Sequence, residues 1–114
     1  MSRFISTAIC ALFLCSICST KASAAGDVVK GKAVYDTNCA LCHTSGMAGS
    51  PKVGDKVAWK TRIKQGEAVL TTNAIKGFKT PGSTGMAMMP KAGKPNLSDK
   101  DINNAVAYMI KSSK

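Results

Sequence analysis

The sequence predicts an all-α fold in one small domain, and three observations lead to this prediction. The chain has 114 residues, which is one domain's length, and it contains six aromatic side chains for its core. No stretch alternates apolar and polar residues as a half-buried strand does. Gly and Pro cluster between Gly46 and Gly54 and between Gly77 and Pro95, which divides the chain into helical pieces.

The amino-terminal segment has the features of a secretory signal peptide. Arg3 provides a positive charge, and the apolar run Phe4–Ile17 is shorter than the ~20 residues that a membrane-spanning helix needs. The small residues Ala22-Ser23-Ala24 follow, as at a cleavage site. We expect residues 1–24 to be removed and residues 25–114 to form the mature periplasmic domain, with an uncleaved membrane anchor as the alternative.

The cysteine pattern excludes a scaffold held by several disulfides. Three of the five cysteines lie in the expected signal peptide: Cys10, Cys15 and Cys18. Cys39 and Cys42 remain, and export places them in an oxidising compartment. One pair so close in sequence closes too short a loop to stabilise a fold, so another component must complete the core.

About four helices are expected in residues 25–114 from apolar spacing and end signals. They are Val28–Asn38, a helix capped by Asp55 and ended by Gly66, Glu67–Lys76 stopped by Gly77, and a last helix capped by Ser98. In the last helix Asp101 completes a capping box. Its apolar residues recur at i, i+4 and i+7: Ile102, Val106 and Met109.

The segment Cys39-Ala40-Leu41-Cys42-His43 carries the strongest chemical signal. Its two thiols stand one helical turn apart on one face, where both can form thioethers with the vinyl groups of a haem. His43 follows directly, so its imidazole meets the iron from the proximal side once the haem is attached. The motif therefore predicts one covalently bound haem c.

Three other interpretations of this motif are less consistent with the sequence. A zinc site needs four ligands, and residues 25–114 offer no Cys or His beyond these three. A thioredoxin-type dithiol belongs on a βαβ unit, which the sequence lacks. A structural disulfide would stabilise little and leave His43 unexplained.

The sixth iron ligand is expected to be a methionine, because His43 is the single histidine of the chain. Met86, Met88 and Met89 lie between the third and last helices. We favour Met89, because Pro90 would stiffen the backbone beside it, then Met88 and then Met86. The alternative is that these methionines only pack against the haem.

With these residues the chain resembles a class I c-type cytochrome, and most closely the small bacterial cytochrome c5 family, over nearly all of residues 25–114. Besides the haem motif, the matching segments are Gly31-Lys32-Ala33-Val34-Tyr35, Gly54-Asp55-Lys56 with Trp59 and Arg62-Ile63, Ala74-Ile75-Lys76-Gly77, Met89-Pro90, and Leu97-Ser98-Asp99 with Tyr108-Met109.

The resemblance implies further contacts. Gly31 and Tyr108 would stand where the first and last helices cross, and the Pro51 carbonyl would accept a hydrogen bond from the His43 ring. The chain departs from the family pattern in two places. Residues 25–114 lack the additional cysteine pair of many relatives, and Ala92-Gly93 replaces the usual glycine pair after Met-Pro.

A haem with both axial positions filled has no open site for a substrate. These residues therefore predict a one-electron carrier with a low-spin His/Met-ligated iron. We expect it to exchange electrons with respiratory or dehydrogenase redox proteins. The alternative is a haem enzyme, or a haem subunit of an oxidoreductase complex, in which the sixth position opens. Arg62 and Trp59 are candidate contacts of a haem propionate, although helix packing also explains Trp59.

The formal charge of +10 suggests an acidic partner. The lysines expected around the haem edge are Lys56, Lys60, Lys64, Lys76, Lys79, Lys91 and Lys94. We expect them to steer docking with an acidic redox protein, or with a membrane oxidase or reductase, and transient contact with a membrane surface is compatible with the same charge. An ordinary solvated surface is the alternative. The secretory signal and the lack of a recognisable motif argue against nucleic acid.

Overall fold

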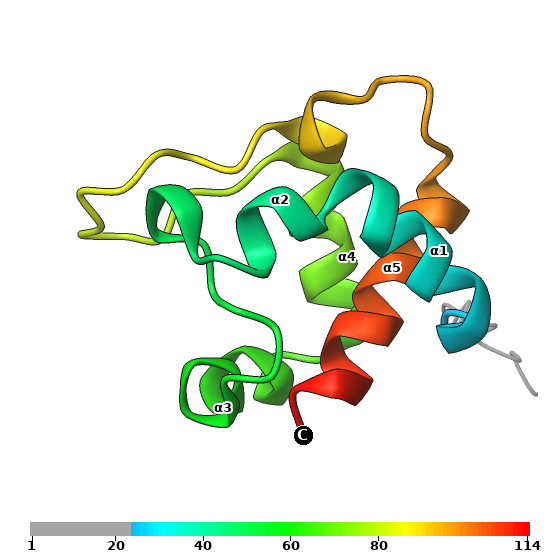
Figure 1. The fold of residues 1–114 in the computed structure, drawn as a ribbon, viewed down its shortest axis with the longest axis horizontal. Coiled ribbons are helices and arrows are strands. Elements are labelled where there is room, and N and C mark those ends of the chain that lie inside the picture. Colours follow the sequence, from blue (N-terminus) through cyan, green and yellow to red (C-terminus); the bar gives the residue numbers. More distant parts are fainter. Residues whose placement is uncertain (1–23) are drawn as a thin grey trace, which may run out of the picture.

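The computed structural model describes residues 24–114, so residues 1–23, with the three amino-terminal cysteines and nearly all of the expected signal peptide, lie outside the described residues. Within residues 24–114 there are five α-helices and two short 3-10 helices, and no strand. They are α1 (Val28–Asn38), α2 (Ala40–His43), η1 (Met47–Gly49), α3 (Lys56–Lys64), α4 (Glu67–Lys76), η2 (Pro90–Gly93) and α5 (Asp99–Ser112) (Figure 1). The predicted all-α class is confirmed.

Side-chain caps explain where the longer helices begin. The Asp55 carboxylate accepts from the backbone N–H of Ala58 at the start of α3. At the start of α5, Ser98 and Asp101 form the predicted capping box. These caps satisfy N–H groups that have no partner inside a helix. The expected starts of the four longer helices and the expected ends of α1 and α4 are confirmed. The sequence did not predict α2, which is a single turn.

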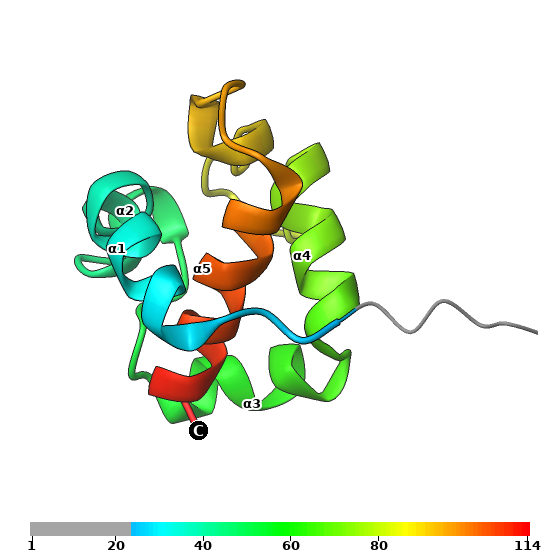
Figure 2. The ribbon, with the colours of Figure 1, turned by 90° about the vertical axis from the view of Figure 1, so that its right-hand side faces the viewer.

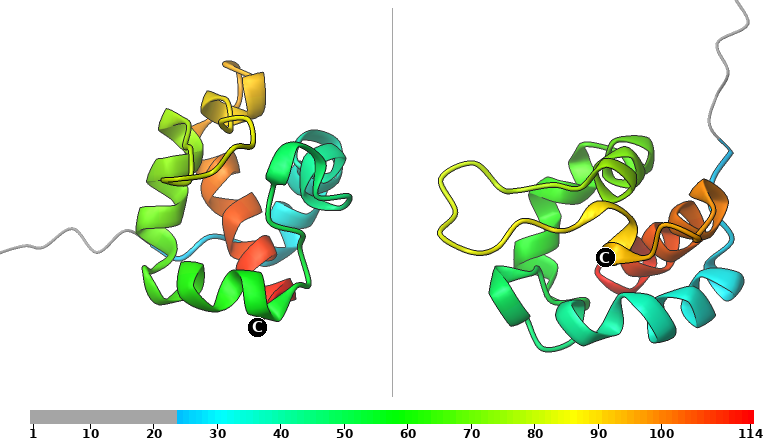
Figure 3. Two further views of the ribbon diagram at one scale, coloured as in Figure 1. Left: turned by 90° about the vertical axis from the view of Figure 1, so that its left-hand side faces the viewer. Right: turned by 90° about the horizontal axis from the view of Figure 1, so that it is seen from above.

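Helix α5 is the centre of the fold, with α1 packed on one side and α4 on the other (Figure 2). Its buried residues supply most of the core. The buried cluster consists of Tyr35, Trp59, Ala74, Ile102, Val106, Met109 and Ile110. Two views from other sides show the same central position of α5 (Figure 3).

The crossing of α1 and α5 depends on a glycine. A Cβ at Gly31 would overlap the backbone carbonyl of Asn104, so only glycine permits this approach. The resemblance implied that Gly31 packs against Tyr108, but the atoms nearest Gly31 belong to the backbone of Asn104 and Ala105. Tyr108 instead pairs with Tyr35 across the two helices, with ring centroids 5.1 Å apart. The close crossing places the end of α1, and therefore α2, in a fixed position.

A long connection, residues 77–98, joins α4 to α5 and extends along one side of the molecule (Figure 1). Phe78 and Met88 pair across it as an isolated antiparallel bridge, with N···O distances of 3.1 and 2.7 Å. The short η2 follows and packs against α4. Among the described residues, none of the helices has both the length and the apolar character to traverse a bilayer.

Candidate haem site

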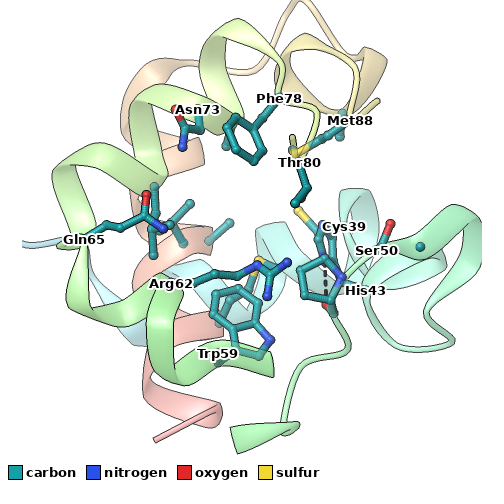
Figure 4. A pocket seen from close by; sticks show the side chains of 18 of the residues that line it. Cys39, His43, Ser50, Trp59, Arg62, Gln65, Asn73, Phe78, Thr80 and Met88 are labelled. Atoms are coloured by element: carbon teal, nitrogen blue, oxygen red, sulfur yellow. Dashed lines mark hydrogen bonds between the residues drawn. The ribbon is translucent and has the colours of Figure 1, made fainter. Parts of the chain in front are cut away.

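A cavity of about 470 Å³ lies between α2, α3, α4, α5 and the connection 77–98. Its wall on α5 is apolar and consists of Ile102, Ala105, Val106 and Met109. Figure 4 shows the labelled side chains around it, with His43, Trp59 and Arg62 on one side and Phe78 and Met88 on the other. The same helix that forms the core therefore also forms the floor of the cavity.

Cys39 and Cys42 both have free thiols, and each is half-buried at the end of α1 and in α2. The Cys39 thiol lines the cavity. Burial, with a smaller contribution from Cys42, raises the pKa of Cys39 to about 11. A thiol-exchange site needs a lowered cysteine pKa, so the environment of Cys39 does not favour a thioredoxin-type dithiol.

His43 takes part in three hydrogen bonds, one of which runs from its backbone N–H to the carbonyl of Cys39 at 3.0 Å. Its Nδ1 lies 2.9 Å from the carbonyl oxygen of Pro51, the contact that the resemblance implied, and its own carbonyl accepts from Val53 at 2.7 Å. Burial lowers the pKa of His43, the Pro51 carbonyl opposes this, and Arg62 lowers it further. With Nδ1 donating to Pro51, Nε2 is left as the free lone pair of a neutral imidazole, which is the form that ligates a metal.

The side chains of the three candidate methionines do not all point to the cavity. Met86 and Met88 line the cavity, whereas Met89, the ligand favoured from the sequence, does not. Met89 is 62% exposed, and its sulfur lies beside Gly93. The chain is extended at this point, so side chains alternate and neighbours face opposite ways. The structure therefore brings Met88 to the cavity and turns Met89 away from it.

Trp59 and Arg62 both line the cavity from α3. The Trp59 indole N–H donates to the carbonyl of Lys52 at 2.8 Å, so its one donor is already used. Arg62 donates one N–H to the carbonyl of Ala58, which leaves its other guanidinium donors toward the cavity. Of the two residues expected to reach a propionate, Arg62 retains the chemistry to do so.

The residues around the cavity fit a haem. The Cys39 thiol, the His43 imidazole and the Met88 thioether line a largely apolar space with Arg62 at its side, and the free thiol of Cys42 follows three residues after Cys39 without lining the space. In residues 24–114 no three His, Cys, Asp or Glu side chains gather as a ligand set for an isolated metal ion. A flat apolar macrocycle with an iron centre matches this donor set. Fold and site together define a protein that binds haem covalently, a c-type haem protein.

Comparison with known proteins identifies the family. The sequence matches the family profile described as "Cytochrome c" over residues 28–113. It is 49% identical to a cytochrome c-555 of Chlorobaculum tepidum across the full length of both chains. It is 32% identical to a cytochrome c5 of Ectopseudomonas mendocina, over 77% of this chain and 95% of that one. The chain therefore belongs to the cytochrome c family and carries a covalently bound c-type haem; it is an electron-transfer protein.

The fold has a close counterpart among solved structures. A protein from a structure described as an electron transfer complex of nitrite reductase with cytochrome c superposes with a TM-score of 0.65 at 33% identity. The match covers 75% of this chain and 95% of that one. The resemblance to class I c-type cytochromes is thus confirmed, and of the two relatives named above the cytochrome c-555 is the more similar.

Proposed function

We propose that this protein is a periplasmic one-electron carrier whose haem iron is ligated by His43 on one face and Met88 on the other. The observation that carries the proposal is that His43 and Met88 line the same cavity from its two sides, with Cys39 between them (Figure 4). The sequence favours Met89 for this role, with Met88 next, and the substitutions described below decide between the two methionines. When bound, the haem supplies an iron that gains and loses one electron.

The chain's own residues explain why electron transfer, and not substrate chemistry, is favoured. Cys39 and Cys42 hold the group covalently, so it cannot exchange. His43 and Met88 would hold the iron from its two sides, which would leave no open position for a small substrate. The α5 wall excludes water and favours the less charged, reduced centre, and the thioether ligand acts in the same direction.

Substitution of each methionine tests the ligand assignment. Met88→Ala should abolish the weak methionine-to-iron band at the red end of the ferric spectrum and lower the reduction potential. Met89→Ala and Met86→Ala are matched controls and should retain both properties. If Met89→Ala abolished the band and Met88→Ala kept it, the assignment to Met88 would be refuted.

We propose that lysines near the cavity steer an acidic redox protein, or an acidic site on a membrane oxidase or reductase, to the haem edge. Lys64 and Lys79 are exposed and adjacent in sequence to residues that line the cavity. The other exposed members of this set are Lys56, Lys60, Lys76 and Lys94. Lys91 is not part of this surface, because its ammonium group is paired with Asp99.

Periplasmic export rests on the composition of residues 1–24, and residues 25–114 would be the mature domain. Denaturing mass spectrometry of protein exported from a host that attaches haem c tests this. We expect the mass of residues 25–114 plus one haem. A retained leader would contradict the cleavage, and a mass without haem would contradict the thioether links.

A further inference from the structure

Residues 24–27 form a short non-helical segment before α1, which we call the amino-terminal strap. Figure 2 shows the strap in blue, passing from α4 across α5 to α1. At Gly26 it lies directly on the central helix, because a Cβ at this position would overlap the backbone carbonyl of Asn103 and crowd Ala107. The strap is therefore packed against α5 as closely as a backbone allows.

Hydrogen bonds between residues far apart in sequence fasten the strap to two helices. The N–H of Gly26 donates to the side chain of Glu67, the first residue of α4, with 2.6 Å between the nitrogen and Oε1. The N–H of Asp27 donates to the side-chain oxygen of Asn104 on α5 at 2.8 Å. The strap therefore joins the start of α4 to the middle of α5.

A direct hydrogen bond between α4 and α5 lies beside the strap. The Thr71 hydroxyl on α4 donates to the side-chain oxygen of Asn103 on α5 at 3.0 Å, and the Asn103 amide donates to the carbonyl of Ala24 at 3.0 Å. Both helices also form walls of the cavity, with Ala74 on α4 and Ile102 on α5 among the lining residues. Contacts that hold the strap thus also hold these two walls together.

Glu67 is the charged side chain of this network that lacks a charged partner among residues 24–114. The ion pairs within that part of the chain join Lys30 to Asp27, Lys32 to Asp36 and Lys91 to Asp99. Glu67 is half-buried, and its carboxylate accepts from a neutral backbone N–H. A carboxylate partly withdrawn from water is stabilised by a cation placed beside it. The segment that contacts Glu67 can provide such a cation.

We propose that Glu67 binds the α-ammonium group that signal-peptide cleavage creates. The inference rests on the proposed removal of residues 1–24. Hydrolysis of the peptide bond between Ala24 and Ala25 adds water, leaving a carboxylate on Ala24 and an amine on Ala25 that is largely protonated at neutral pH. This ammonium group stands one residue from the nitrogen that Glu67 contacts. Cleavage thus gives the strap a charged contact with α4, which only the processed chain has.

The experiment measures how fast acetic anhydride acetylates the α-amine of the processed holoprotein at neutral pH, by mass spectrometry of its amino-terminal peptide. Only the neutral amine reacts, and lysine side chains stay protonated at this pH. An ammonium group held by a carboxylate gives up its proton less readily. Glu67→Gln keeps an oxygen for the Gly26 N–H but loses the charge. We expect acetylation to become about threefold faster, as for loss of a partly exposed ion pair.

Asp36→Asn is the matched control. Asp36 lies near the far end of α1 and pairs with Lys32, so this variant loses the same charge at a distance from the strap. Its α-amine should react at the wild-type rate. Equal acceleration in Asp36→Asn and Glu67→Gln would reveal a general charge effect and overturn the proposal.

A second variant displaces the strap without changing its charge. In Gly26→Ala the added methyl group meets the Asn103 carbonyl, so the strap must move off α5. Acetylation should then accelerate even though Glu67 is intact. Adding Glu67→Gln to Gly26→Ala should give little further increase, because both changes remove the same contact. Fully additive effects would contradict a shared contact.

The same mass spectra separate this proposal from the proposed cleavage. A peptide that still carries residues 1–24 would refute the cleavage. A peptide that begins at Ala25, together with an unchanged acetylation rate in Glu67→Gln, would refute the role of Glu67 alone.

Discussion

Gly31 in α1 lies directly against the backbone carbonyl of Asn104 in α5, with no room for a Cβ between them. The helices can therefore cross closely enough for α1 to deliver Cys39 to the cavity. Asn104 is buried at this crossing, and its side-chain oxygen accepts from the backbone N–H of Asp27 at 2.8 Å. One residue pair thus couples helix packing to the placement of the haem motif.

The first prediction concerns this crossing. Gly31→Ala should lower the free energy of unfolding by about 2–3 kcal/mol, because the added methyl group forces the helices apart. Helix propensity alone would give the opposite sign, since alanine is favoured over glycine. Urea denaturation of the holoprotein measures the change. Val29→Ala is the control on the same helix, and because Val29 is 84% exposed its effect should stay within about 0.5 kcal/mol.

The second prediction separates the roles of Trp59 and Arg62. Trp59→Phe leaves the Lys52 carbonyl without its donor, so stability should fall by about 1–2 kcal/mol while the reduction potential stays near the wild-type value. Arg62→Leu should lower the potential, because a positive charge beside the iron favours the reduced state. Protein-film voltammetry gives the potentials. A large shift in Trp59→Phe with none in Arg62→Leu would contradict this division.

The third prediction concerns acid stability. Hydrogen bonds from Ser98 to the Asp101 carboxylate lower its pKa below the ordinary 3.8. The folded pKa is the lower one, so this contribution is present above pH 3.8 and is lost as pH falls through the folded pKa. Asp101→Asn should therefore show a flatter fall in stability below pH 3.8 than the wild type.

Ser98→Ala tests the same cap from its other side. It should cost about 1 kcal/mol at neutral pH, the usual value of an N-cap. Unfolding curves recorded from neutral pH to below 3.8 compare the two variants with the wild type. If stability fell with decreasing pH in both variants as it does in the wild type, the capping box would not contribute to the pH dependence.

The fourth prediction addresses partner docking. Lys79→Glu should slow electron transfer to an acidic redox partner several-fold at low ionic strength, and added salt should remove most of the difference. Stopped-flow mixing at several salt concentrations measures it. Lys30→Glu makes the same charge change on α1, away from the cavity, and should have a much smaller effect. Equal slowing by both would indicate net charge and not a docking surface.

The helices could be predicted from the sequence because their end signals are local. Asp55 and Ser98 act on N–H groups within three residues, and Gly77 has the positive φ of +84° that only glycine adopts without strain. The haem motif is local as well, since Cys39 and Cys42 lie on neighbouring positions of one short segment. Such features do not depend on how the chain folds back on itself.

The sequence alone is less informative about which methionine ligates the iron. Pro90 restricts the backbone beside Met89 but does not determine the direction of the Met89 side chain. Alternation along an extended segment would have placed Met86 and Met88 on one side and Met89 on the other, and that signal was present in the sequence. The pairing of Met88 with Phe78 sets the register of this segment. Because this pairing depends on tertiary contacts, it could not be predicted from the sequence.

The partners of Trp59 and Lys91 could not be predicted for the same reason. Each donates to a carbonyl group, of Lys52 and of Leu97, whose position is set by folding. Lysine spacing alone suggested that Lys91 belonged to the docking surface. Its contact with Asp99, which lysine spacing does not reveal, is the reason for leaving it out of the proposed docking surface.

Because α5 packs against α1 with one face and lines the cavity with the other, assembly of this protein has a preferred order. A polypeptide that has not yet received its haem has no packing partner for the α5 residues that line the cavity, so its compact state is less populated than that of the finished protein. Proteases would degrade this polypeptide faster than the finished protein. The rate at which haem is attached to the polypeptide, more than the polypeptide's own stability, should therefore determine how much protein accumulates in the cell.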